Sequence, residues 1–344
     1  MTHDSFYEHF ADSLYEDGKP INLVKLTNKN NVSITLMDIG ATWLRCQLPL
    51  KNTLNESFRD IILFAKNLSA HKKQTAYLGV TVGPYANRIA NACYHLNGKH
   101  YSLLANEGEN ALHGGQIGLD KLRFEIAHIS KQSVHFKTQS LIDGFAKPIA
   151  IEVIYELSDD DSISLTYKGL SSEDTFLNLT NHAYFNLSGI ESEHSIFDHF
   201  IYLNSNNYLE LSESNIPTGR IVNCKNTDAD LTTLSQFKRP YDTAFILEKT
   251  ANQSGKADVV LISPDKDVSL KLFTTKPSIQ LYTADFMTNA EGPFGMYPRS
   301  HGVAIEPQYF PDGPNHPEWV GKNGFLKANS AYEHKTIYQL TFSQ

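Results

Sequence analysis

The sequence predicts an all-β protein, a large antiparallel β-sandwich, and two observations support this prediction. Short runs in which apolar and polar residues alternate recur along the chain, and this period of two is typical of strands with one buried face. Patterns with the helical period of 3.6 are scarce, and no strand-like run alternates with a sustained amphipathic helix, which argues against a parallel α/β architecture. The alternating runs lie at residues 31–38, 133–140, 149–158, 162–169, 268–274 and 336–342.

Within each run the apolar side chains fall on alternate positions. In chain order they are Val32, Ile34 and Leu36; Val134 and Phe136; Ile149, Ile151, Val153, Tyr155 and Leu157; Ile163, Leu165 and Tyr167; Val268, Leu270 and Leu272; and Tyr338, Leu340 and Phe342. Turn-favouring clusters separate the runs at residues 96–100, 158–162 and 263–267. The polar, turn-rich stretch 204–241 predicts long connections. No repeat, low-complexity tract or linker interrupts the chain, so we expect a single domain spanning residues 1–344.

Composition and charge narrow the class of protein. Of the 344 residues, 41% are hydrophobic and 20% are charged, as in ordinary water-soluble proteins. The net charge of −8 argues against a nucleic-acid partner, because sequence-independent binding needs a basic face to displace counterions from phosphates. The acidic, polar N-terminus lacks a signal-peptide pattern and no run of about 18 apolar residues occurs, so we expect a cytoplasmic protein without a membrane partner. Cys46, Cys93 and Cys224 are widely spaced, which predicts neither a disulfide framework nor a structural zinc site.

Five segments place polar and ring-bearing side chains where strands are expected to end. They are residues 83–91, 110–115, 178–189, 239–245 and 303–319. In the last segment an apolar strand is expected to end at Glu306 and to open into a proline-rich loop. Taken singly, the candidate side chains have plain structural explanations. These are a surface ion pair for Arg88, a tight turn for His113, a buried histidine bonded to backbone for His182, and a turn or cap for Asp242.

Five motifs nevertheless occur together along the chain. They are Asn87-Arg88-Ile89, Leu112-His113-Gly114-Gly115, Asn181-His182 with Tyr184-Phe185-Asn186-Leu187, Tyr241-Asp242 before Phe245, and Glu306-Pro307-Gln308 with Pro311-Asp312. In this order and approximate spacing they resemble the aldose 1-epimerases, also called galactose mutarotases, over nearly the whole chain. The resemblance implies a β-sandwich of the galactose mutarotase-like type with an open sugar-binding cleft. It also implies interconversion of the α and β anomers of free aldohexoses, such as galactose and glucose, without a cofactor or a metal.

The resemblance further implies a role for each matching residue. The expected roles are general base for Glu306, general acid for His182, and sugar binding for Asn87, Arg88, His113 and Asp242. The chemistry fits this division, because mutarotation removes a proton from the anomeric hydroxyl and donates one to the ring oxygen. An imidazole titrates close to neutral pH, where such a group works best. Two segments depart from the family pattern, Pro84 and residues 119–124, and they leave the shape of the cleft and the sugar preference open.

Three alternatives remain open at this point. A hexose-6-phosphate mutarotase would share the fold but would need a basic pocket, for which Arg88, Arg220 and Arg299 are the candidates. A glycosidase would need two opposed carboxylates, such as Glu306 and Asp242, and would leave the histidines without a role. A non-catalytic sugar-binding module would need no matched acid and base. The partner is expected to be a small monosaccharide, and the sequence is compatible with a monomer or a homodimer.

Overall fold

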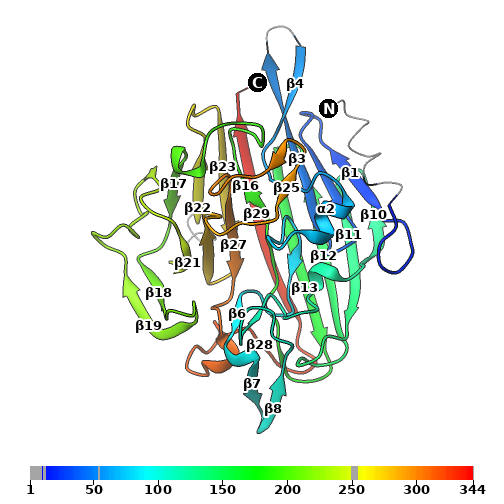
Figure 1. Cartoon of the computed structure of the whole chain (residues 1–344), viewed down its shortest axis with the longest axis vertical. Coiled ribbons are helices and arrows are strands. Elements are labelled where there is room, and N and C mark those ends of the chain that lie inside the picture. The colour runs from blue at the N-terminus through cyan, green and yellow to red at the C-terminus, as the bar shows by residue number, and fades with distance from the viewer. Residues whose placement is uncertain (1–9, 11–12, 53–54, 249–254, 344) are drawn as a thin grey trace.

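Two large antiparallel sheets dominate the computed structural model, which describes residues 10, 13–52, 55–248 and 255–343 (Figure 1). The nine-stranded sheet contains, in spatial order, β10 (Glu125–Ile129), β11 (Ser133–Ser140), β12 (Ile149–Leu157), β13 (Ser162–Ser171), β29 (Tyr332–Phe342), β23 (Val268–Thr274), β22 (Val259–Ile262), β17 (Phe200–Leu203) and β20 (Ser235–Gln236). The six-stranded sheet contains β16 (Tyr184–Phe185), β27 (Val303–Gln308), β24 (Ser278–Tyr282), β21 (Asp242–Ile246), β18 (Asn207–Leu211) and β19 (Pro217–Asn223). The predicted all-β class is confirmed.

Smaller elements surround these two sheets. A four-stranded sheet contains β1 (Leu23–Thr27), β2 (Ser33–Met37), β3 (Thr42–Asn52) and β4 (Asn55–Asp60). The two-stranded ladders are β5 (Thr81–Val82) with β15 (Thr180–Asn181), β6 (Arg88–Ile89) with β9 (Ala111–Leu112), β7 (Cys93–Leu96) with β8 (Lys99–Ser102), β14 (Thr175–Phe176) with β28 (Phe325–Leu326), and β25 (Glu291–Gly292) with β26 (Gly295–Met296). The helical pieces are α2 (Leu68–Lys73) and the short 3₁₀ turns Ala90–Ala92, Leu119–Lys121, Ile196–Asp198 and Gly313–Asn315. No described helix is both long and apolar enough to cross a membrane.

The six alternating runs of the sequence all form strands, namely β2, β11, β12, β13, β23 and β29. In β12 the residues at alternate positions from Ile149 to Leu157 are buried, whereas Glu152 and Glu156 are partly or fully exposed. The polar stretch 204–241 differs from its prediction, because it contains the hairpin β18–β19 at the edge of the six-stranded sheet. The alternation in that hairpin is weak, since most of its side chains are partly or fully exposed.

The main hydrophobic core receives side chains from both large sheets. Phe245, Ile279 and Ile305 come from the six-stranded sheet, and Val153 and Leu270 come from the nine-stranded sheet. Each buried side chain of this kind contributes about 1.5–3 kcal/mol relative to an exposed one. This cluster draws on strands from β1 to β29.

Candidate active site

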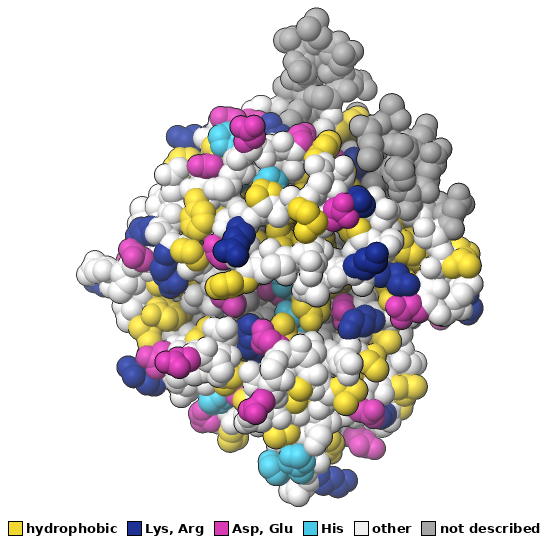
Figure 2. All heavy atoms as spheres, in the orientation of Figure 1, with side chains coloured by type: hydrophobic (Ala, Val, Ile, Leu, Met, Phe, Trp, Pro, Cys, Tyr) yellow, Lys and Arg dark blue, Asp and Glu magenta, His cyan; other side chains and the backbone are white. Residues whose placement is uncertain are grey.

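A cleft of about 330 Å³ opens on one face of the molecule. Figure 2 shows a hollow near the centre of this face, with histidine, acidic and basic side chains around it. The volume lies within the range of about 300–1,000 Å³ that is usual for small-molecule sites. The lining includes every side chain that the sequence selected for the site: Asn87, Arg88, His113, His182, Asp242 and Glu306.

Glu306 enters the cleft from β27, a strand that is buried on both faces. Because side chains alternate along a strand, Val303 and Ile305 reach the main core while Glu306 faces the opposite way. The prediction that this strand ends at Glu306 is wrong, since it continues through Pro307 to Gln308. In the described part of the chain β16 pairs only with the first two residues of β27, so Pro307 lies where one edge of the strand is open.

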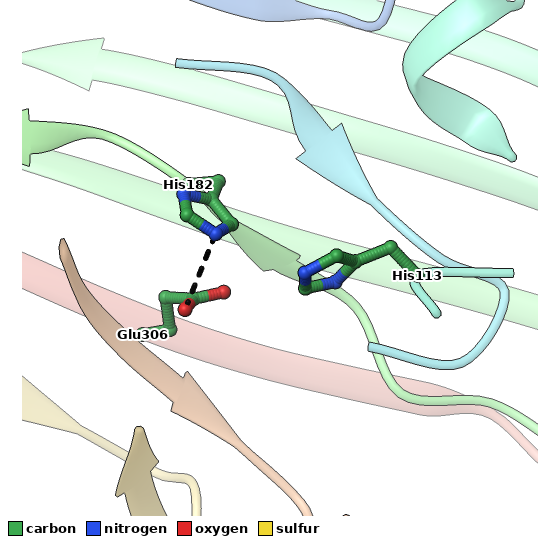
Figure 3. Close-up of side chains that lie close together, drawn as sticks. All are labelled: His113, His182 and Glu306. Carbon is green, nitrogen blue, oxygen red and sulfur yellow. Dashed lines mark ion pairs between the residues drawn. The ribbon is translucent and has the colours of Figure 1, made fainter. Parts of the chain in front are cut away.

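His182 follows β15 and lies directly against Glu306 (Figure 3). Its Nε2 is 3.5 Å from Glu306 Oε1, and the side chains of the two residues are 5% and 2% exposed. The backbone of His182 is held by Val80 and Gly79, since its N–H donates to the Val80 carbonyl and its carbonyl accepts from the Gly79 N–H. Two buried atoms of the pair, His182 Nδ1 and Glu306 Oε2, have no hydrogen-bond partner in the protein. The pair therefore has unused hydrogen-bonding capacity beside the cleft.

Burial opposes charge on both members of this pair. Desolvation raises the pKa of Glu306 well above its usual value; nearby Asp242 adds to this shift, and Arg88 opposes it. Desolvation lowers the pKa of His182 to about 4. The two shifts favour a proton on the carboxyl group and a neutral imidazole.

His113 points toward the same pair from the turn after β9 (Figure 3). Its Nδ1 accepts the backbone N–H of Asn87 at 3.2 Å, so in the neutral ring the proton lies on Nε2. Burial lowers the pKa of His113 well below its usual value, and nearby His182 and Arg88 add to this effect. The neutral ring can therefore donate a hydrogen bond from Nε2 to an acceptor oxygen.

The two glycines after His113 permit the tight turn that holds this ring. Gly114 has φ +96°, and a Cβ atom there would lie 2.2 Å from the carbonyl oxygen of Gly83. Gly115 has φ +88°, and its Cβ would lie 2.4 Å from the Leu104 carbonyl oxygen. Neither position can accept a side chain without a backbone shift.

Arg88 and Asp242 form the polar side of the cleft. Arg88 lies in β6, which pairs with β9, and its Nη1 is 3.7 Å from Asp242 Oδ2. Asp242 begins β21 and also accepts a hydrogen bond from the side-chain amide of Gln280 on β24. Burial raises the pKa of Asp242, and Arg88 and Gln280 oppose that shift.

The site also contains residues that the sequence did not select. They include Tyr77, Glu107, Gln280 and Tyr282. Tyr77 lies against both histidines, with ring centroids 4.6 Å from His113 and 5.9 Å from His182. Gln280 carried a usable signal, because it is a polar residue in the middle of the apolar strand-like run 278–282. The two departures from the family pattern, Pro84 and residues 119–124, do not line the cleft.

His113, His182 and Glu306 could also hold a divalent ion. One ligand atom from each lies within 4.8 Å of the others, and no second group of this kind occurs in the described residues. Two imidazoles and a carboxylate are suitable zinc ligands. The same three groups can exchange protons with a hydroxyl and an ether oxygen without any ion.

Comparisons with known proteins agree with this geometry. Residues 22–339 match the family described as aldose 1-epimerase. The chain is 36% identical over 337 residues to an aldose 1-epimerase of Haemophilus influenzae, covering 94% of this chain and 96% of that relative. It is 31% identical over 294 residues to a galactose mutarotase of Bos taurus, covering 82% and 84% of the two chains. A solved aldose epimerase homologue from C. elegans has a TM-score of 0.85 and 25% identity, covering 94% of this chain and 100% of that one. The chain therefore belongs to the aldose 1-epimerase family and is an isomerase.

Proposed function

We propose that this isomerase interconverts the α and β anomers of free aldohexoses, such as galactose and glucose, by opening and reclosing the sugar ring. The observation that carries the proposal is the buried pair of Glu306 and His182, 3.5 Å apart in a cleft of monosaccharide size. A carboxylate and an imidazole at this separation can reach two neighbouring oxygens of one sugar.

Ring opening uses the pair in its charged form. Glu306 takes the proton of the anomeric hydroxyl while His182 donates a proton to the ring oxygen, and the bond between C1 and the ring oxygen breaks. The resulting aldehyde rotates about C1–C2. In ring closure, His182 takes the proton of the hydroxyl that attacks C1, and Glu306 returns a proton to the carbonyl oxygen. The cycle conserves protons and needs no electron transfer.

One shared proton accounts for both halves of this cycle. Opening begins with an ionised Glu306 and a protonated His182, and closure begins with both groups neutral. Burial favours the neutral form, since it raises the pKa of Glu306 and lowers that of His182. The Arg88 guanidinium favours the ionised form of Glu306. Each half of the cycle converts one form into the other, so the pair returns to its starting protonation state when the ring has closed.

The remaining polar groups of the cleft suit a sugar with several hydroxyls. We assign sugar binding to Arg88, Asn87, His113 and Asp242, which all line the cleft. His113 supplies a donor from Nε2, Asp242 supplies acceptors, and Arg88 supplies donors. The aromatic rings of Tyr77 and Tyr184 provide apolar surface for the faces of the sugar ring.

The structure disfavours a phosphorylated sugar. Of the candidate phosphate ligands, Arg220 and Arg299 do not line the cleft, and Arg88 is already paired with carboxylates. A non-catalytic binding module would have no use for a buried acid and base in contact, because buried titratable groups are costly.

Polarimetry tests the proposal directly. Fresh α-D-galactose or α-D-glucose is mixed with a catalytic amount of protein, and the relaxation of optical rotation is compared with that of buffer. We expect a rate proportional to protein concentration. A rate equal to the buffer blank for galactose, glucose, arabinose and xylose would refute mutarotation and favour a binding module.

A further inference from the structure

Arg88, the one arginine or lysine among the described residues of the cleft lining, is held by a carboxylate that the proposed mechanism does not use. Glu107 Oε2 accepts from Arg88 Nε at 2.6 Å, and Oε1 accepts from Nη2 at 2.7 Å. Two parallel bonds of this kind fix the plane of a guanidinium as well as its position. The Arg88 side chain is only 10% exposed, while that of Glu107 is 38% exposed. Glu107 therefore lies nearer to solvent than Arg88.

Backbone and side-chain hydrogen bonds hold the turn that carries Glu107 in place. Glu107 and Asn110 exchange backbone hydrogen bonds of 3.2 and 3.0 Å across a tight turn. The side chain of Asn106 accepts the Leu112 N–H at 2.7 Å and donates to the Leu112 carbonyl at 3.0 Å. Leu112 is in turn the strand partner of Arg88. The turn that carries Glu107 is thus tied to the residue opposite Arg88.

The pairing leaves one side of the guanidinium for the substrate. With Nε and Nη2 bonded to Glu107, Nη1 is the nitrogen that faces Asp242, at 3.7 Å. Three carboxyl groups, those of Glu107, Asp242 and Glu306, line the cleft around this arginine. A substrate that carried a negative charge would meet a site whose only arginine or lysine is already paired with carboxylates, and such like-charge contacts are costly.

We propose that Glu107 is a positioning and specificity residue, which orients Arg88 toward neutral aldoses and excludes sugars with an acidic group. The inference rests on the proposed function for its substrate class. It predicts two separable contributions: the bidentate contact orients Arg88, and the negative charge selects against anions.

The test compares galactose with galacturonate, which differ in carrying a neutral or an ionised group at C6. Calorimetry gives both affinities, and polarimetry gives both values of kcat/KM. Glu107→Gln removes the charge and one acceptor, Glu107→Asp keeps the charge but shortens the reach, and Glu109→Gln makes the same charge change at an exposed position on the same turn.

We expect Glu107→Gln to weaken galactose binding several-fold and to raise the affinity ratio of galacturonate to galactose roughly tenfold or more. Glu107→Asp should weaken galactose binding but keep the wild-type ratio, and Glu109→Gln should change neither. Melting temperatures check that each variant is folded. An unchanged ratio in folded Glu107→Gln, or an equal change in Glu109→Gln, would overturn the inference. The affinity ratio decides even if polarimetry detects no mutarotation, a result that would count against the proposed function alone.

Discussion

Replacing Glu306 by Gln tests the proposed general base with little change in shape. Oε2 of Glu306 is buried without a protein partner, and Oε1 is 3.5 Å from His182 Nε2. The amide keeps the size of the carboxylate and one oxygen acceptor, but it cannot take up a proton at neutral pH. The other groups that line the cleft are untouched, so sugar binding should survive.

The expected effect is a loss of turnover with little loss of affinity. Positioned proton transfer typically contributes ~10²–10⁴-fold, so we expect kcat to fall by about 100-fold or more. KM should change only a few-fold, as for a group that acts mainly in the transition state. The folded protein should not be weakened. Burial raises the pKa of Glu306, so the carboxylate form is disfavoured in the folded state, and the neutral amide avoids that cost.

The assay pairs polarimetric kcat with calorimetric galactose affinity for the same folded protein. Glu333→Gln, an exposed position on β29, serves as the matched control. His182→Asn should do comparable harm, and the double variant should cost less than the product of the two single losses, because the pair acts as one unit. If Glu306→Gln binds galactose and turns over within a few-fold of wild type, Glu306 is not the base and the mechanism proposed here is wrong.

Three further predictions address pH, stability and metal. Asp242→Asn removes a negative charge that raises the pKa of Glu306, so the acid–base pair should lose its shared proton at lower pH. The alkaline limb of the pH profile of kcat/KM should therefore move to lower pH. A limb that stays in place or moves to higher pH would contradict this electrostatic account. Lys276→Met should remove a pH dependence of stability, because burial lowers the pKa of Lys276 well below its usual value although its Nζ bonds to Asn178 and Tyr332. The native lysine adds stability as the pH rises toward about 10.4, so the melting temperature of the Met variant relative to wild type should fall between pH 7 and that pH, and a constant difference would disprove the reasoning. Dialysis against EDTA should leave mutarotation unchanged, and activity that is lost and then restored by a divalent ion would instead assign the three-residue cluster to a catalytic metal.

The strands were predictable because their signal is local. In β12 and β23 the side chains at every second position are buried, and the sequence alone shows that period. The hairpin β18–β19 was missed because it lies at a sheet edge, where most of its side chains are partly or fully exposed and the alternation fades. Its formation depends on pairing with β21, which is a tertiary contact.

The residues that line the site divide in the same way. The proposed acid, base and sugar ligands were recognisable because each lies in a short motif that resembles those of one family. Glu107 was not recognisable from the sequence, because its proposed role depends on its pairing with Arg88. Arg88 lies 19 positions away, and the ladder of β6 and β9 brings the two segments together. Either residue alone reads as an ordinary surface charge. The sequence also could not reveal that burial raises the pKa of Glu306 and lowers that of His182, because each shift depends on the strands that surround the pair.

The arrangement separates the chemistry of the site from its selectivity. Glu306 lies on β27, a strand buried on both faces, so its carboxylate position is fixed by the packing of the two large sheets. Arg88 instead lies on the two-residue ladder of β6 and β9, and His113 lies beside it. Glu107, the carboxylate proposed to orient Arg88, lies on the turn just before β9. A substitution in that turn can change which sugar is held without moving Glu306 or His182. A substitution that repacks β27 would move the proposed base and is expected to affect every sugar alike. Sugar preference in this chain is therefore expected to depend on the turn that carries Glu107. Proton transfer is expected to depend on the six-stranded sheet that carries Glu306.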